Sequence, residues 1–427
     1  MKGIVDCNNF YCSCERLFKP QLDKKPVVVL SNNDGCIISR SDEAKQLGIE
    51  MAVPYFMAKP LIRKHGVSVF SSNYNLYGDL SWRVMETLKM MLGKKNVEVY
   101  SVDEAFIDLD MFAPEEINRI ATGIRHTVEQ WTGIKVSVGV APTKVLAKLA
   151  NRISKKDKQK SGCVTLLDTE DRIINALRQT PVEDIWGVGH QYAKKLKETW
   201  CIYDGLQLRN LSEDFARTHL GGVVGARLIR ELRGIPSREM EEELVNKKMI
   251  ATTRMFGNAV GNIDDIKEAV ATYTSRAAEK LRRQSSAAKV ISVFVVTKDQ
   301  DHQLNFKHRG TISKHTILPV ATSFTNELIK PAVQLVDHLF ENGQLYKKAG
   351  VMLSGIIPDE SVQGNLFVPE SKNLERKLMD MIDNVNFSQR DDILKFASSG
   401  TTRDWKMRQE LRSPRYTTRW EEMFEVS

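Results

Sequence analysis

The stretch YSVDEAF, residues 100–106, sets two adjacent carboxylates, Asp103 and Glu104, at the end of an apolar, β-branched run. Acidic side chains beside strand-forming residues are costly to bury unless they are paired or bind a metal ion. An isolated Asp-Glu pair is also typical of a solvated turn between two strands. A third carboxylate, Asp6, ends a short apolar strand at the N-terminus. Three carboxylates that converge from two strands suit a site for two hard divalent cations, which prefer oxygen ligands.

The segments around these acids predict one sheet that would bring them together. Their order is strand, helix, strand pair, helix and strand, which is a split βαβ arrangement. The expected segments are 3–6, 73–92, 97–102, 105–109, 114–131 and 135–140. The first strand of such a sheet can lie beside the strand pair, which would place Asp6 next to Asp103 and Glu104. Neighbours in a regular strand point to opposite faces, but a corner between the two strands relaxes this constraint.

Composition indicates a soluble globular protein with a polyanionic partner. The chain has 427 residues, 42% of them hydrophobic and 27% charged, and its length suggests about three domains. The net charge of +8 favours a partner such as a nucleic acid. Because no apolar run approaches the roughly 18 residues of a membrane helix and no secretory signal is evident, we expect a cytoplasmic protein without a membrane partner. Six cysteines without a CxxC pair fit free thiols and argue against zinc.

Basic residues recur along one side of a predicted helix at 142–154. Lys144, Lys148 and Arg152 follow an i, i+4, i+8 spacing, which gives a continuous stripe on that helix. Such a stripe is usually a solvated face. Binding of phosphate is the alternative here, because the stripe belongs to the same predicted domain as the acidic site.

A glycine-rich turn opens a second basic helix within residues 181–196. Gly187 and Gly189 precede Lys194 and Lys195, and a plain turn is the default interpretation of such a pattern. Two glycines at a helix N-terminus also present backbone N–H groups that suit a phosphate. The segment resembles a helix-hairpin-helix, which binds the DNA backbone without reading its sequence.

Four motifs in this order resemble a Y-family translesion DNA polymerase: VDCNNFY, SVDEAF, APTKVLAKLAN and WGVG. Three further segments resemble the UmuC family within it, namely PVVVLSNNDGCIISRS, FSSNYNLYGDLSWRVM and the C-terminal SPRYTTR. Members of this family are catalytic subunits of bacterial DNA polymerase V and their relatives on plasmids and other mobile elements. The resemblance covers nearly the whole chain and is densest before Leu196.

The resemblance implies an α+β fold in the form of a right hand, with a ferredoxin-like palm and a helix-hairpin-helix in a helical thumb. The expected domains are a palm (1–30 and 73–166), small fingers (31–72), a thumb (167–236), a linker (237–245), an α+β little finger (246–348) and a C-terminal interaction region (349–427). The linker could instead form an exposed helix, and the C-terminal region is expected to be partly ordered.

The resemblance also implies a catalytic centre. Asp6, Asp103 and Glu104 match the catalytic, metal-binding carboxylates of the family. The backbone carbonyl of Cys7 would be a further ligand, and the site would hold two Mg²⁺ ions. Tyr11 matches the steric gate, whose ring excludes a ribose 2′-hydroxyl, and a core aromatic side chain is the alternative for this position.

Two lysines match positions that contact the nucleotide triphosphate in the family. Lys155 matches such a lysine directly, and Lys45 falls where many relatives place an Arg or Lys. Asp42 departs from the family pattern, because many Y-family enzymes have a triphosphate-contacting Tyr there. Arg40 or Ser41 would then have to replace that contact.

A short motif in the C-terminal region resembles the peptide by which polymerases bind the sliding clamp. In QGNLF, Gln363 would donate or accept a hydrogen bond, and Leu366 and Phe367 would fill an apolar pocket. Gly364 replaces the usual Leu, which predicts weak binding. The alternative is a loop with incidental apolar residues.

The function that the resemblance implies is error-prone synthesis of DNA past lesions in the SOS response. Deoxynucleotides would be added to a primer 3′ end by two-metal-ion nucleotidyl transfer, in the cytoplasm at the bacterial nucleoid. The expected partners are primer-template DNA, deoxynucleoside triphosphates, a UmuD-like cleaved accessory protein, RecA and the sliding clamp. The alternatives are a DNA polymerase IV-type enzyme and a non-catalytic DNA-binding scaffold for polymerase exchange.

Overall fold

The computed structural model describes residues 1–156, 161–241, 246–298, 310–363, 372–389, 392–401 and 403–424. The chain divides into two compact units. The first unit is Met1–Leu30, Cys36–Leu244 and Leu411–Ser427, and the second is Ser31–Gly35 with Val245–Glu410. The chain therefore returns to the first unit at its C-terminal end. No helix among the described residues is long and apolar enough to cross a membrane.

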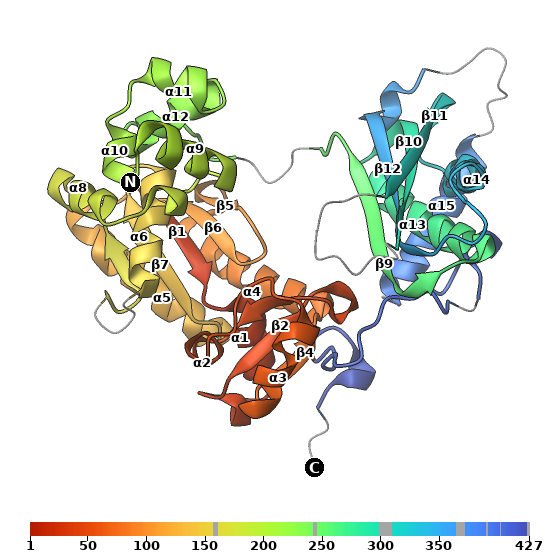
Figure 1. The fold of residues 1–427 in the computed structure, drawn as a ribbon, viewed down its shortest axis with the longest axis horizontal. Helices are drawn as coiled ribbons and strands as arrows, with labels where there is room; N and C mark the ends of the chain where they lie inside the picture. Colours follow the sequence, from red (N-terminus) through yellow and green to blue (C-terminus); the bar gives the residue numbers. More distant parts are fainter. Residues whose placement is uncertain are drawn as a thin grey trace. The chain divides into compact units, whose positions relative to one another are not determined.

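A five-stranded sheet forms the centre of the first unit, in the order β5-β6-β1-β7-β8. Its strands are β1 (Lys2–Cys7), β5 (Val97–Val99), β6 (Glu104–Asp108), β7 (Val136–Ala141) and β8 (Val164–Leu166). β1 lies between β6 and β7 and is antiparallel to both (Figure 1). This arrangement confirms the prediction that the first strand lies beside the strand pair.

Each face of this sheet has its own apolar core, because successive side chains of a strand alternate between the faces. Val5 belongs to the core that α4 (Tyr74–Leu92) and α5 (Ile117–Thr132) cover. Its neighbour Ile4 belongs to the core on the other face, which α6 (Lys144–Lys156) covers. The predicted helices at 73–92, 114–131 and 142–154 are thus present with small shifts of their ends.

A smaller sheet follows the first helix of the chain, in the order β3-β2-β4. Its strands are β2 (Val27–Leu30), β3 (Ile37–Arg40) and β4 (Ser68–Ser71), and its neighbouring helices are α1 (Phe10–Leu17), α2 (Asp42–Gln46) and α3 (Tyr55–Lys64). All four residues of β2 are buried, as a continuous apolar run predicts. β4 is an edge strand, so one of its sides is open to pairing.

Residues 170–232 are helical, which agrees with the helical character expected for 167–236. The helices are α8 (Glu170–Arg178), α9 (His190–Trp200), α10 (Gly205–Arg209), α11 (Glu213–His219) and α12 (Val223–Leu232). Their buried side chains share one core with α6. The described part of the predicted linker, residues 237–241, contains no helix.

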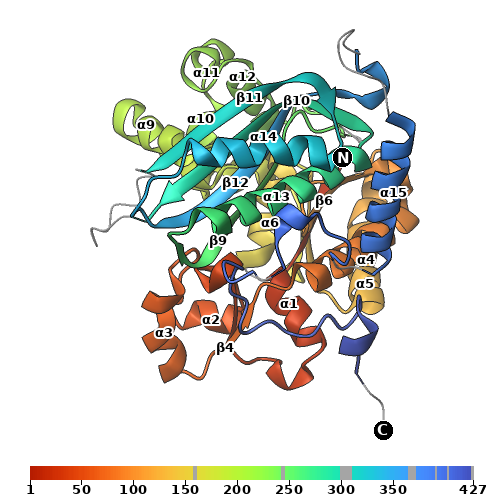
Figure 2. The same ribbon diagram turned by 90° about the vertical axis from the view of Figure 1, so that its right-hand side faces the viewer.

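The second unit is a four-stranded antiparallel sheet with two helices on one face, in the strand order β11-β10-β12-β9. Its elements are β9 (Ile250–Val260), α13 (Ile263–Arg283), β10 (Ser286–Thr297), β11 (Thr311–Thr322), α14 (Thr325–Asp337) and β12 (Tyr346–Pro358). Figure 2 shows α13 and α14 side by side across the sheet. The predicted boundary at residue 348 falls inside β12, a central strand, so this domain extends at least to Pro358.

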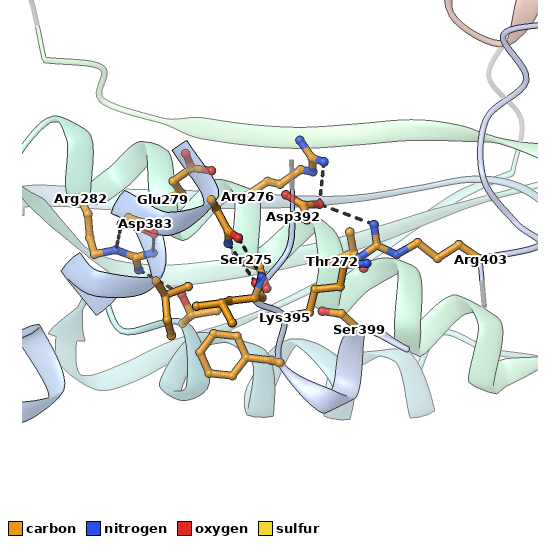
Figure 3. A pocket seen from close by; sticks show the side chains of 15 residues that line it. Thr272, Ser275, Arg276, Glu279, Arg282, Asp383, Asp392, Lys395, Ser399 and Arg403 are labelled. Atoms are coloured by element: carbon orange, nitrogen blue, oxygen red, sulfur yellow. Dashed lines mark hydrogen bonds and ion pairs between the residues drawn. The ribbon is translucent and has the colours of Figure 1, made fainter. Parts of the chain in front are cut away.

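The described part of the C-terminal region is more extensively packed than the sequence predicts. It contains α15 (Lys372–Ser388), which an ion pair joins to α13. The Arg282 guanidinium donates to both carboxylate oxygens of Asp383, at 2.7 and 2.8 Å. Beyond α15, Asp392 accepts from Arg276 at 2.7 Å and lies 3.5 Å from Arg403 (Figure 3). Within the second unit, these ion pairs therefore join the described residues that follow the sheet to α13.

The close approach of α6 to the central sheet depends on Gly139 in β7. A Cβ atom at this position would overlap the backbone nitrogen of Asn151 and the carbonyl oxygen of Ala147. We expect Gly139→Ala to lower the free energy of unfolding by about 2–3 kcal/mol, since the helix backbone must move away. Urea unfolding, followed by circular dichroism, measures this change.

Gly78→Ala is the matched control, because a Cβ at this exposed position of α4 has no neighbour within 4 Å. It should raise the free energy of unfolding by about 0.5–1 kcal/mol through helix propensity. Equal effects of the two substitutions would contradict the assigned role of Gly139.

Candidate active site

The three predicted carboxylates lie where β1 ends and β6 begins. Asp6 is opposite Glu104 in the antiparallel register, and it is 7% exposed. Asp103 lies in the turn that precedes β6, and its carbonyl oxygen accepts a hydrogen bond of 2.8 Å from the Cys7 backbone N–H. Its side chain accepts from the Ser101 hydroxyl at 2.6 Å. The predicted corner is therefore present, and the sheet itself brings Asp6 and Glu104 together.

Two lysines of α6 neutralise this acidic pair. Lys155 Nζ lies 2.5 Å from a carboxylate oxygen of Asp6. Lys148 Nζ donates to both carboxylate oxygens of Glu104 at 2.9 Å. Since both lysines project from the helix that covers this face of the sheet, α6 supplies the cations that allow the acids to be buried.

The prediction of a solvated basic stripe on α6 is wrong. Lys144 is only 3% exposed, and its ammonium forms an ion pair with Glu98 of β5. Arg152 forms an ion pair with Asp184. Together with the pair between Lys148 and Glu104, these contacts show that each cation of the stripe faces a carboxylate.

Burial and charge shift the pKa values of the two adjacent acids in opposite directions. Burial raises the pKa of Asp6 to about 7, although the Lys155 ammonium opposes the shift, and the hydrogen bond with Glu104 adds to it. Burial acts on Glu104 in the same direction. Hydrogen bonds with Asp6 and Lys148 outweigh it and hold the pKa of Glu104 below its usual range. Two carboxylates this close share a proton when no further cation is present.

The donor set suits a hard divalent cation, but the lysines must first move. In the described part of the chain, no group of three or more His, Cys, Asp or Glu side chains is already arranged around a metal-sized position. Carboxylate oxygens are nevertheless the ligands that Mg²⁺ prefers. Burial, together with the neighbouring carboxylates, raises the pKa of the Cys7 thiol, so its backbone carbonyl is the better ligand.

Tyr11 lies in an aromatic group next to this site. Its ring is stacked on Tyr77, with centroids 4.5 Å apart, and it meets Tyr74 edge-on at 6.0 Å. Burial raises the pKa of Tyr11 to about 12, so its hydroxyl stays protonated at neutral pH. The side chain is half-buried and packs against two aromatic rings, so it is not a fully buried core residue, and its role as the gate stays a prediction.

Lys45 binds Asp42, the residue that departs from the family pattern. Its Nζ donates to Asn9 at 2.5 Å and to Asp42 at 3.0 Å. Asn9 in turn donates to Asp42 at 3.1 Å. Asp42 therefore neutralises Lys45 in this structure.

The predicted hairpin has the expected local geometry. Gly187 adopts φ 103°, a conformation that favours glycine, and Gly189 is the N-cap of α9. Lys194 lies 4.0 Å from Glu198, and Lys195 lies over the Trp200 ring at 5.0 Å. Of the predicted clamp motif, Gln363 is described, whereas Leu366 and Phe367 lie outside the described residues.

Comparison with known proteins identifies the family. Residues 5–152 match the impB/mucB/samB family, residues 247–366 match the C-terminal domain of that family, and residues 376–426 match a domain of unknown function, DUF4113. Protein UmuC of Salmonella typhimurium is 42% identical over 428 residues, and the match covers 100% of each chain. Protein ImpB of the same species is 38% identical and covers 99% of each chain.

The chain belongs to the impB/mucB/samB family.

This membership confirms the predicted resemblance to the UmuC family of Y-family translesion DNA polymerases, and with it DNA-directed DNA polymerase activity. Solved structures agree with the predicted polymerase fold. A Y-family DNA polymerase chimera, Dbh-Dpo4(243-245)-Dbh, matches with a TM-score of 0.68 and 22% identity, over 84% of this chain and 99% of that chain. Y-family polymerases use divalent metal ions, which agrees with the carboxylate donor set.

Four residues behind Tyr11 were missed by the sequence interpretation. They are Glu15, Asn73, Tyr77 and Ser413, which form one hydrogen-bonded group. Asn73 and Tyr77 lie in FSSNYNLYGDLSWRVM, and Ser413 lies in SPRYTTR, two of the segments that resemble the UmuC family. That resemblance was the available signal, but it assigned these residues no role.

Without a bound metal ion, Asp6 should make the stability of this protein depend on pH. Because the pKa of Asp6 rises from 3.8 to about 7 on folding, the folded state keeps a proton that the unfolded chain loses between these values. The free energy of unfolding should therefore fall as pH rises through this window. With EDTA present, Asp6→Asn should melt several degrees above the original chain at about pH 8, with a much smaller difference at about pH 5.

Asp168→Asn is the control for this measurement, because its carboxylate is 40% exposed and pairs with Arg172 near solvent. It should change the melting temperature little at either pH. An Asp6→Asn effect of equal size at both pH values would contradict the assigned shift.

Proposed function

We propose that Asp6, Asp103 and Glu104 hold two Mg²⁺ ions and direct nucleotidyl transfer onto a primer 3′ end opposite damaged template. The observation that supports this most directly is the pairing of buried Asp6 with half-buried Glu104, with Asp103 in the adjoining turn. When bound, the ions would lower the pKa of the primer hydroxyl and neutralise the triphosphate and its leaving pyrophosphate. The Cys7 carbonyl would complete the oxygen ligands.

Lys155 would have two successive partners in this proposal. Without nucleotide, its ammonium pairs with Asp6 at 2.5 Å. Binding of other cations at Asp6 would release this half-exposed side chain, which could then contact the triphosphate. Lys148 is less exposed and pairs with Glu104, so it would keep that carboxylate oriented. Lys45 could contact the triphosphate only after separation from Asp42.

Tyr11 would form the floor under the sugar of the incoming nucleotide. Its ring would meet a 2′-hydroxyl and so exclude ribonucleotides. The hairpin at Gly187 and Gly189 would hold the DNA backbone through its N–H groups, with Lys194 and Lys195 adding positive charge. Solved relatives of similar fold include one titled as an insertion ternary complex of Dbh DNA polymerase, which supports primer-template DNA and a nucleotide as partners.

We further propose a UmuC-type role in the SOS response, at the bacterial nucleoid. A UmuD-like cleaved accessory protein, RecA and the sliding clamp would be its protein partners. The full-length match to UmuC supports this role over a DNA polymerase IV-type enzyme. DNA polymerase IV of Staphylococcus aureus is 28% identical and covers only 78% of this chain. The intact carboxylates argue against a non-catalytic scaffold.

Loss of a carboxylate should abolish primer extension without loss of DNA binding. We expect Asp103→Ala and Glu104→Gln each to lower the extension rate by at least about a hundredfold, because charge stabilisation at the reacting phosphate is lost. Extension of a labelled primer on a lesion-bearing template, with the candidate partners present, measures the rate, and fluorescence anisotropy measures DNA binding. Extension at the original rate would refute the proposed catalytic centre.

Removal of the Tyr11 ring should relax sugar selection. Tyr11→Ala should lower the preference for deoxynucleotides over ribonucleotides by at least about tenfold, because the steric exclusion of the 2′-hydroxyl disappears. Single-nucleotide incorporation with matched dNTP and rNTP substrates gives the ratio of kcat/KM values. If the ratio does not change, Tyr11 is not the gate.

A further inference from the structure

The C-terminal residues 411–424 pack against the elements that carry Tyr11. They begin beside the edge strand β4. The Ser71 N–H donates to the Leu411 carbonyl at 3.0 Å, and the Leu411 N–H donates to the Ser71 hydroxyl at 2.9 Å. Ser71 and Arg412 form a parallel bridge, so the segment extends the open side of the small sheet.

Asn73 fixes this segment to the start of α4. Its side-chain oxygen accepts from the Leu76 N–H as the helix cap. Its amide nitrogen donates to the carbonyl and hydroxyl oxygens of Ser413, at 2.9 and 3.0 Å, and to the Pro414 carbonyl at 3.1 Å. Asn73 is 1% exposed, and its hydrogen bonds with Leu76 and Ser413 are buried.

A buried carboxylate of α1 connects this segment to the aromatic group. Glu15 is fully buried, and one of its oxygens accepts from the Ser413 hydroxyl at 2.9 Å and from the Tyr77 hydroxyl at 2.6 Å. The Tyr77 ring is the one stacked on Tyr11 at 4.5 Å, with an interplanar angle of 18°. The support of Tyr11 therefore continues through Tyr77 and Glu15 to Ser413.

The segment is also anchored at the far end of α1. Tyr416 packs against both Phe18 and Phe424, with centroid distances of 4.7 Å, and the two phenylalanine rings are 6.5 Å apart, so the three rings form one cluster. Arg415 donates to Glu422 through its backbone N–H and its guanidinium, at 2.6 to 3.0 Å, which closes the segment on itself. Residues 411–424 thus contact α1 at both the Glu15 turn and the Phe18 end.

We propose that residues 411–424, which fall in the domain of unknown function, act as a brace that positions Tyr11 and thereby sets sugar selection. Ser413, Glu15 and Tyr77 are positioning residues in this role, because they act on the nucleotide only through the Tyr11 ring. The proposal rests on the proposed function of Tyr11 as the steric gate. It assigns the C-terminal segment a part in substrate choice, in addition to any binding of protein partners.

The test breaks the connection at two places in the full-length chain. Tyr77→Phe keeps the ring that supports Tyr11 but removes the hydroxyl that donates to Glu15. Ser413→Ala removes the hydroxyl on the other side of Glu15. Each substitution should lower the dNTP-to-rNTP ratio of kcat/KM by about threefold to tenfold, which corresponds to part of one hydrogen bond to a charged group. If one variant fails to fold, the other variant still tests the proposal.

A double-mutant cycle with Tyr11→Ala tests whether Tyr77 and Ser413 act on sugar selection through the Tyr11 ring. In the Tyr11→Ala background, Tyr77→Phe and Ser413→Ala should have no further effect on the ratio, because the ring through which they act is absent. Trp420→Ala is the control within the same segment, since Trp420 is 85% exposed. It should leave the ratio unchanged.

Three results would overturn the proposal. If Tyr11→Ala lowers the ratio but neither Tyr77→Phe nor Ser413→Ala does, Tyr11 is the gate but residues 411–424 do not position it. Effects of the same size in both backgrounds would mean that these residues act independently of Tyr11. If Tyr11→Ala leaves the ratio unchanged, the proposed gate fails, and the brace fails with it.

Discussion

The burial of two neighbouring carboxylates between β1 and β6 is the constraint on which the site depends. Asp6 and Glu104 repel each other when both are ionised, and burial weakens their hydration. The structure compensates with Lys155 and Lys148, both from α6. This compensation works only while α6 lies close to the sheet. Gly139 permits that approach, since a side chain there would overlap the backbone of α6. The close packing of α6 against the sheet therefore also determines the electrostatics of the site.

The same arrangement suits a site at which metal ions would replace a lysine ammonium group. Lys155 is 35% exposed and Lys148 is 16% exposed at their side chains, so one of the two is easier to displace. A salt bridge near solvent stabilises little and can be broken at small cost, whereas a more buried pair holds its geometry. The carboxylate of Asp6 is thus held by the more replaceable cation. This difference between the two lysines follows from their positions on α6, one near its middle and one at its last turn.

Much of the fold could be predicted from periodicity, and part of the site could not. The order of strands and helices around Asp6 followed from alternating and helical patterns, and from that order the first strand was expected beside the strand pair, as β1 lies beside β6. The spacing of the basic residues could not predict which of them are buried in α6. Lys144 pairs with Glu98, which belongs to a strand far from it in the sequence. The boundary at residue 348 was misplaced because the pattern of a strand does not indicate which sheet the strand joins, and β12 pairs between β10 and β9. The link between Asn73 and Ser413 joins residues 340 positions apart, and such contacts leave no periodic signal.

The C-terminal segment also explains why α1 tolerates a fully buried acid. A carboxylate without partners in a core would be strongly destabilising, and Glu15 is 0% exposed. Its hydrogen bonds come from Tyr77 and Ser413, and burial still raises its pKa. One of the two donors therefore comes from residues 411–424, so the hydrogen bonds of Glu15 Oε1 depend in part on this segment, whereas Glu15 Oε2 has no hydrogen-bond partner among the described residues. Because α1 also carries Tyr11, a change in how the segment packs would also act on the helix that carries the proposed gate.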